Sequence, residues 1–192
     1  MPGVPVPRRG RAPGAGGEPG RSGDRLPPPA LVTPLRTATA ADAGALAALI
    51  NAAFKVERFF IEGDRTNEDE VRAYMKKGTF LLADQDGAPV GCVYVEERGD
   101  RGYFGLLAVD PAQHGQGRGR SLIQAAEERF RRAGCRAVDI QVVDLRIELA
   151  PFYRRLGYVE TGTAPFPAEG RATRPCHFIR MSKPLTPEAS PD

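Results

Sequence analysis

The chain contains few of the side chains from which metal centres and disulfide frameworks are built. Among its 192 residues there are three cysteines and two histidines. Cys92, Cys135 and Cys176 lie far apart, and their odd number argues against a disulfide framework or a zinc site and favours a reducing compartment. His114 and His177 are too few for a histidine-rich metal centre, so we expect no metal.

Long apolar runs are missing as well. No stretch reaches the roughly 20 apolar residues that span a bilayer, and none has the form of a signal-peptide core. We therefore expect a soluble, cytoplasmic protein with no membrane partner.

The formal charge of +3 is concentrated at one end of the chain. Residues 1–34 carry five arginines against Glu18 and Asp24, which accounts for the whole net charge and leaves the remainder neutral. The alkaline pI of about 8.9 therefore gives no reason to expect nucleic-acid binding by the rest of the chain.

Residues 1–34 are rich in Pro, Gly and Arg, have no aromatic residue and show no apolar periodicity. Such a segment buries too little surface to offset the entropy of ordering, which predicts a disordered tail. A basic arm that contacts nucleic acid or an acidic surface is the functional alternative, and a solvated extension is the simpler one.

Apolar periodicity in residues 35–184 predicts alternating strands and helices, with residues 185–192 as a second tail. A capping box of Thr66 and Glu68 is expected to start the second helix. In residues 89–97, Val93 and Val95 alternate with more polar positions, which predicts one less buried face. The expected strands are 35–38, 79–83, 89–97, 103–109, 138–143, 158–163 and 177–182, and the expected helices are 39–54, 66–77, 118–133 and 147–156.

The most informative stretch is residues 106–123, where a strand, a glycine-rich turn and a helix start follow one another. An apolar run ends at Asp110-Pro111, and Gly then occurs at alternate positions from Gly115 to Gly119. Glycines let the backbone turn sharply and present N–H groups at the positive end of a helix, where an anion is favoured. With Arg118 and Arg120 beside them, these residues predict a phosphate-binding loop.

The glycine spacing selects among phosphate-binding motifs. It lacks the Gly-Lys-Ser/Thr of a P-loop, and a meander of strands before it argues against a dinucleotide-binding βαβ unit. The segment His114–Gly119 instead resembles the pyrophosphate loop of the GNAT N-acetyltransferase superfamily, Gln/Arg-x-x-Gly-x-Gly/Ala, with His114 at the first place.

A second segment carries the same resemblance. Residues 151–158, Pro-Phe-Tyr-Arg-Arg-Leu-Gly-Tyr, are similar to the superfamily's Phe-Tyr-x-x-x-Gly-Phe/Tyr, although Arg146 stands where many members have Asn. The resemblance covers residues 35–184. It implies a mixed α+β, GNAT-like fold: a mostly antiparallel sheet of about seven strands flanked by about four helices, in the order β-α-α-β-β-β-α-β-α-β-β.

The resemblance also implies a reaction and a donor site. The donor would be acetyl-CoA, and an amine would attack its thioester directly in a ternary complex, with no metal. The N–H of Leu107 would stabilise the oxyanion and Tyr153 would protonate the departing thiolate; Tyr153 has a purely structural alternative as a core aromatic. The donor-binding residues expected from it are Leu107, Ala108, Val109, His114, Gly115, Gln116, Gly117, Arg118, Gly119, Arg120 and Ser121.

Other roles stay open at the level of sequence. Glu96 is a candidate general base, directly or through water, and is equally a hairpin surface charge. Glu62, Asp64 and Arg65 lie where superfamily members place acceptor-binding loops, but an ordinary polar loop fits as well. The two acids slightly favour a cationic amine, and Arg65 weakens that preference.

The acceptor, a small molecule or a protein amine, is not identified by the sequence, which also leaves a homodimer open. The rivals to a transferase are a non-catalytic acyl-CoA-binding or sensing module, and an interaction protein that acts through its basic tail.

Overall fold

The computed structural model describes residues 35–167 and 171–185. The strands are β1 (Leu35–Thr37), β2 (Thr79–Gln85), β3 (Ala88–Arg98), β4 (Arg101–Val109), β5 (Ala137–Val143), β6 (Val159–Pro165) and β7 (His177–Pro184). The α-helices are α1 (Ala43–Phe54), α2 (Glu68–Met75), α3 (Arg118–Arg132) and α4 (Leu149–Arg155).

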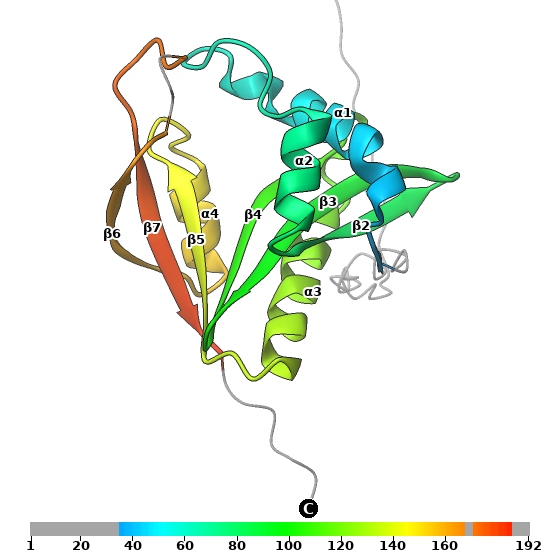
Figure 1. Ribbon diagram of the computed structural model, residues 1–192. Coiled ribbons are helices and arrows are strands. Elements are labelled where there is room, and N and C mark those ends of the chain that lie inside the picture. The colour runs from blue at the N-terminus through cyan, green and yellow to red at the C-terminus, as the bar shows by residue number, and fades with distance from the viewer. Residues whose placement is uncertain (1–34, 168–170, 186–192) are drawn as a thin grey trace, which may run out of the picture.

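The strands form one seven-stranded sheet in the order β1-β2-β3-β4-β5-β7-β6 (Figure 1). β4 and β5 pair in parallel, and the other ladders are antiparallel. The mixed α+β class and the element order predicted from the sequence are thereby confirmed.

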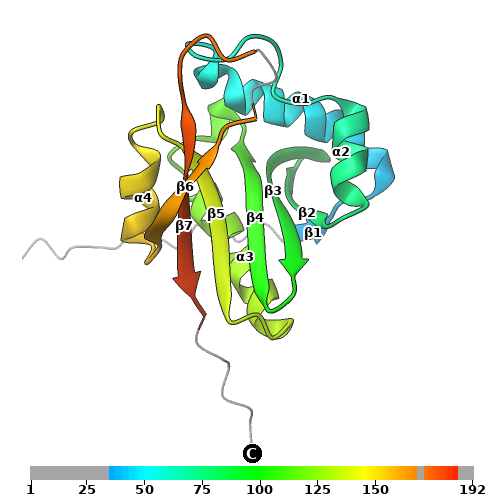
Figure 2. The ribbon, with the colours of Figure 1, turned by 60° about the vertical axis from the view of Figure 1, so that its left-hand side comes forward.

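Two helical layers cover the sheet on opposite faces (Figure 2). α1 and α2 pack with side chains such as Phe80 and Tyr94 in one apolar cluster, while α3 and α4 pack with Val93 and Phe104 in the other. Because β3 is central, its residues from Val90 to Val95 are buried on both faces. The expectation of a less buried face on this strand was wrong, since alternation reports exposure only where one face meets water.

The N-cap of the second helix lies one residue later than the sequence suggested. Its N-cap is Asn67, whose side chain accepts a hydrogen bond from the N–H of Glu70 at 2.9 Å. Thr66 is buried and donates to the Glu70 carboxylate at 3.0 Å. The expected capping box of Thr66 and Glu68 was therefore wrong, because Asn is at least as good an N-cap as Thr.

Both expected tails fall mostly outside the described residues, which exclude 1–34 and 186–192. Leu185, which the sequence assigned to the second tail, is 5% exposed in the cluster with α3 and α4. Its N–H donates to the carbonyl of Arg136 at 2.8 Å. The packed domain thus continues through Leu185. None of the helices in the described part of the chain is both long and apolar enough to cross a membrane.

The feature that positions the site is a divergence of β4 from β5. The two strands pair only where residues 101–103 face residues 137–139; beyond that point β4 follows β3 and β5 follows β7 (Figure 1). A bulge in β4 accompanies the divergence: Leu106 has a φ of +46°, and the register with β3 shifts beside it. Bulges bend a strand and increase its twist, so the sheet opens into a V here.

Candidate active site

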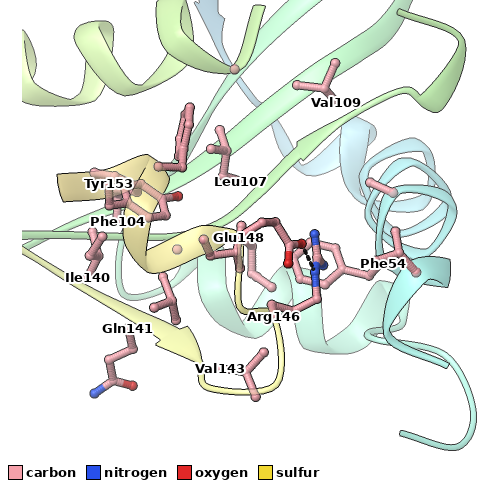
Figure 3. A pocket seen from close by; sticks show the side chains of 18 of the residues that line it. Phe54, Phe104, Leu107, Val109, Ile140, Gln141, Val143, Arg146, Glu148 and Tyr153 are labelled. Carbon is pink, nitrogen blue, oxygen red and sulfur yellow. Dashed lines mark hydrogen bonds and ion pairs between the residues drawn. The ribbon is translucent and has the colours of Figure 1, made fainter. Parts of the chain in front are cut away.

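A cleft of about 810 Å³ occupies the opening between β4 and β5. Its wall includes Leu107, Phe152 and Tyr153, which belong to the α3/α4 side of the sheet, and Phe54 and Tyr103, which belong to the α1/α2 side. Figure 3 shows Tyr153, Phe104 and Leu107 in one part of the cleft and Phe54, Arg146 and Glu148 in another. The cleft is therefore lined by residues from both faces of the sheet.

The predicted phosphate loop lies at one end of this cleft, on the α3 side. Gly115 and Gly117 have φ values of +78° and +75°, the left-handed conformation that other residues adopt only at a cost. Gly117 is the N-cap of α3 and no side chain caps this end among the described residues, so first-turn N–H groups of the helix remain available for an anion. Gly115, Gly117 and Gly119 all line the cleft.

Some side chains of the loop form hydrogen bonds with the rest of the protein, and others only line the cleft. His114 Nε2 lies 3.1 Å from the carbonyl oxygen of Val109, which ties the loop to the end of β4. Arg118 donates to Gln85 at 2.7 Å and to Gln113 at 3.3 Å, so its guanidinium is already engaged by the protein. Arg120 is exposed and lines the cleft.

Three residues expected at the donor site do not line the cleft. Ala108 is buried against α1, because it points to the other face of β4 from Leu107 and Val109. Gln116 is exposed on the loop. Ser121 turns back to donate to the carbonyl of Gly117 at 3.3 Å. Leu107 and Val109 do line the cleft, on the edge of β4 that no longer pairs with β5.

Tyr153 lies in the cleft wall, held by aromatic neighbours. It is 7% exposed, and its ring centroid lies 6.1 Å from that of Phe104 and 5.7 Å from that of Tyr158. Its hydroxyl makes no hydrogen bond with any residue that the structure describes. Burial raises the pKa of Tyr153, and the neighbouring Tyr103 raises it further, so the hydroxyl stays protonated.

Tyr158 differs from Tyr153 in having a fixed partner. Its hydroxyl donates to the carboxylate of buried Glu127 at 2.9 Å, and Lys183 donates to the same carboxylate at 2.8 and 2.9 Å. Tyr158 and Glu127 are not part of the cleft wall. This arrangement is consistent with a structural position for Tyr158.

Glu96 lies behind the cleft and not in its wall. Arg98 donates to its carboxylate at 2.8 Å, and Tyr94, whose ring does line the cleft, donates to it at 3.1 Å. The hydrogen bond from Arg98 is the main cause that lowers the pKa of Glu96. Any proton exchange between Glu96 and the cleft would have to pass through Tyr94 or water.

One carboxylate that was not expected from the sequence, that of Glu57, lies directly in the cleft. Glu57 is 5% exposed and belongs to a short 3₁₀ turn, Lys55–Glu57, that follows α1. Arg146 lies 3.4 Å from Glu57 and 2.6 Å from Glu148 (Figure 3). Burial raises the pKa of Glu57, while Arg65 and Arg146 oppose that rise. Arg146, noted in the sequence as a departure from Asn, was the one available signal.

The loop acids expected at the acceptor site lie away from the cleft. Asp64 forms an exposed ion pair with Arg58 at 3.3 Å, and Glu62 is exposed, so neither carboxylate lines the cleft. Arg65, the third residue of that set, does line it. The three residues are close in sequence, but the structure brings only Arg65 to the same cavity as Tyr153 and Leu107.

The described cysteines are free thiols, and burial raises the pKa of Cys92 and Cys135. No group of three or more His, Cys, Asp or Glu side chains within residues 35–167 and 171–185 is arranged to hold a metal ion.

Comparison with known proteins agrees with this architecture at the level of family. The model of the acetyltransferase (GNAT) family matches residues 45–158, more than half of the chain. The mycothiol acetyltransferase of Propionibacterium freudenreichii subsp. shermanii is 32% identical over 108 residues, which cover 56% of this chain and 31% of that protein. The chain thus spans about a third of the length of this relative.

Solved structures show the same fold. The ribosomal-protein-S18-alanine N-acetyltransferase from Escherichia coli superposes with a TM-score of 0.66 at 17% identity, over 82% of this chain and 96% of that one. A phosphinothricin acetyltransferase from Sinorhizobium meliloti, in complex with acetyl-CoA, gives a TM-score of 0.66 at 18% identity, over 84% and 93% of the two chains.

The cleft between β4 and β5 and the glycine-rich start of α3 belong to a fold of the class that the sequence resemblance implied. The match over residues 45–158 then makes the assignment specific: the chain belongs to the GNAT acetyltransferase family.

Proposed function

We propose that the protein is an acetyl-CoA-dependent N-acetyltransferase, in which an acceptor amine attacks the thioester directly in a ternary complex. The observation that carries the proposal is the cleft between β4 and β5, with the glycine loop on the α3 side and Glu57, Arg65 and Arg146 among its lining residues. Similar solved structures that contain acetyl-CoA support the choice of donor.

The donor would bind through the backbone. The diphosphate of coenzyme A suits the N–H groups at the start of α3, where the helix dipole favours an anion. The amide-rich pantetheine arm would lie along the open edge of β4 near Leu107 and Val109, as an added strand does. Side-chain changes at Leu107 would then act mainly through packing.

The chemistry needs an oxyanion donor and an acid. When the amine nitrogen bonds to the carbonyl carbon, charge develops on oxygen, and we assign the N–H of Leu107 to it; such a donor contributes about 2.7–4 kcal/mol. The general base takes the extra proton of the attached nitrogen, the carbonyl re-forms as the carbon–sulfur bond breaks, and the thiolate takes the proton of the Tyr153 hydroxyl, which Tyr153 regains from solvent after the products leave. That hydroxyl is protonated and has no competing acceptor among the described residues.

Two carboxylates compete for the role of general base. Glu96, expected from the sequence, would act through Tyr94, which donates to it at 3.1 Å. Glu57 lines the cleft and has its pKa raised by burial, which brings a carboxylate closer to the range useful for a base. Glu57→Gln and Glu96→Gln separate them: the base variant loses turnover and the acidic limb of its pH–rate profile.

Calorimetry with acetyl-CoA, followed by a thiol-release screen of amines with mass detection of the product, tests the proposal. We expect saturable binding of acetyl-CoA and a product whose mass exceeds that of the acceptor by one acetyl group in place of one hydrogen. Binding without transfer to any amine would favour the acyl-CoA-binding module instead. Absence of binding would refute both.

A further inference from the structure

Arg65 has an environment that its neighbours in sequence do not share. Its Nε atom is buried and has no hydrogen-bond partner, and its guanidinium carbon lies 5.4 Å from the centroid of the Phe54 ring. The Nε end of the side chain is thus enclosed by the protein, and the residue also lines the cleft. The terminal nitrogens make no hydrogen bond or ion pair with any residue in the described ranges.

The other charges on this side of the cleft are already matched. Arg146 pairs with both Glu57 and Glu148, at 3.4 and 2.6 Å. Arg65 acts on Glu57 only through space, because Arg146 provides that carboxylate's direct contact. Asp64, which directly precedes Arg65, is paired with Arg58. The terminal N–H groups of Arg65 therefore have no hydrogen-bond acceptor among the described residues.

Its place in the cleft separates it from the donor. Phe54 and Tyr103, which accompany Arg65 in the lining, belong to the apolar cluster on the α1/α2 face, opposite the face that α3 covers. The diphosphate loop is at the start of α3, so an anion at Arg65 would come from the second substrate. A guanidinium presents parallel N–H donors that fit a carboxylate or a phosphonate in a two-pronged bond.

We propose that Arg65 binds an anionic group of the acceptor, so that the amine substrate carries a carboxylate or phosphonate. This inference rests on the proposed function and narrows its acceptor class. It reverses the weak preference for cationic amines that Glu62 and Asp64 suggested, because those two carboxylates lie outside the cleft. The aromatic rings of Phe54, Tyr74 and Tyr103, which line the same cleft as Arg65, would contact an apolar part of the same acceptor.

The test compares matched acceptors with acetyl-CoA as donor. Each of the standard amino acids is paired with its uncharged α-amide, aminomethylphosphonate is added, and spermidine represents cationic amines. We expect thiol release with anionic acceptors at a kcat/KM at least tenfold above that of the matched amides. Arg65→Met should lower kcat/KM for the anionic acceptors by tenfold or more and bring the acid-to-amide ratio close to one.

Two further variants separate recognition from folding. Arg65→Lys keeps the charge and should retain part of the acid preference. Arg58→Met removes an exposed arginine from the same segment and should leave the ratio unchanged. Binding of acetyl-CoA should stay within twofold in all three variants, because the donor site lies on the other face.

Equal use of acids and amides by the wild type, or an equal loss for both in Arg65→Met, would overturn the inference. So would release with spermidine alone, or with no member of the panel while acetyl-CoA binds. Failure of acetyl-CoA to bind would instead overturn the proposed function, so the two failures are distinguishable.

Discussion

The sharpest test of the proposed chemistry is Tyr153→Phe, which removes one oxygen atom from the cleft wall. General acids contribute about 10²–10⁴ in rate, or about 3–5 kcal/mol at 1.36 kcal/mol per decade. The hydroxyl has no hydrogen-bond partner among the described residues, so its removal leaves no donor or acceptor unpaired. We therefore expect kcat to fall at least about 100-fold while the free energy of unfolding changes by less than about 1 kcal/mol.

Tyr158→Phe is the matched control, since it removes the same atom from the same aromatic cluster but outside the cleft wall. That hydroxyl donates to buried Glu127 at 2.9 Å, and hydrogen bonds to charged groups are worth about 1.5–3 kcal/mol. Glu127 keeps its contacts with Lys183, so the fold should survive. We expect a lower Tm with kcat at 25 °C close to the wild-type value.

The assay is thiol release with an acceptor found in the screen, combined with calorimetry of acetyl-CoA and thermal unfolding. Because burial raises the pKa of Tyr153, the acid stays protonated below its ordinary pKa of about 10, and it should add no alkaline limb to the pH–rate profile from pH 7 to 9. Equal kcat for Tyr153→Phe and wild type would refute the acid role. So would an equal loss of kcat in both tyrosine variants.

Three further perturbations address the donor loop, the fold and the electrostatics. In Gly119→Ala the added methyl group meets only Val109 Cγ2, at 3.8 Å, so Tm should be unchanged or slightly raised by the better helix propensity of Ala. The same methyl group would lie where the diphosphate is proposed to bind, so calorimetry should show an acetyl-CoA affinity reduced at least about tenfold. Unchanged affinity would count against diphosphate binding at this turn. Gly102→Ala places a Cβ 2.3 Å from the Phe130 ring, and such overpacking costs about 1–3 kcal/mol, seen as a fall in Tm of several degrees; a Tm equal to wild type would contradict this packing. Arg36 lowers the pKa of Asp42 by hydrogen bonding, so the stabilisation is present above the unfolded pKa of about 3.9 and lost as pH falls through the folded value. Asp42→Asn should accordingly lower the urea midpoint most at pH 7 and by progressively less as the pH falls below about 3.9, and a difference that does not shrink over that acid range would exclude this linkage.

The sequence predicted those parts of the molecule that depend on local pattern. Strand and helix order follow from apolar periodicity, and the loop from Gly115 to Gly119 follows from glycine spacing, because backbone conformation there depends on residues next to one another. The predictions were wrong where the packing of neighbouring elements determines the local structure. The N-cap of α2 is Asn67 and not Thr66, and β3 is buried on both faces because a helix covers each.

The residues on the α1/α2 side of the cleft show why other parts of the site could not be predicted from the sequence. Glu57 and Arg146 are separated by 89 positions, yet their side chains meet at 3.4 Å. Glu62, Asp64 and Arg65 are close together in the chain and polar, but of these three only Arg65 lines the cleft. Neither the contact between Glu57 and Arg146 nor the position of Arg65 in the cleft could be predicted from periodicity, spacing or composition. Both depend on where the turn after α1 meets the end of β5.

This difference also indicates how the two substrate sites can vary independently. In the proposed mechanism the donor would be bound by backbone N–H groups at the start of α3, which depend on glycines that keep a fixed turn. The acceptor would instead be bound by side chains from segments that pack on the opposite face of the sheet. We therefore expect a substitution at Arg65 to change which amine is used without altering donor binding. For the same reason, membership of the family determines the fold but not the acceptor, which would depend on the side chains of this second face.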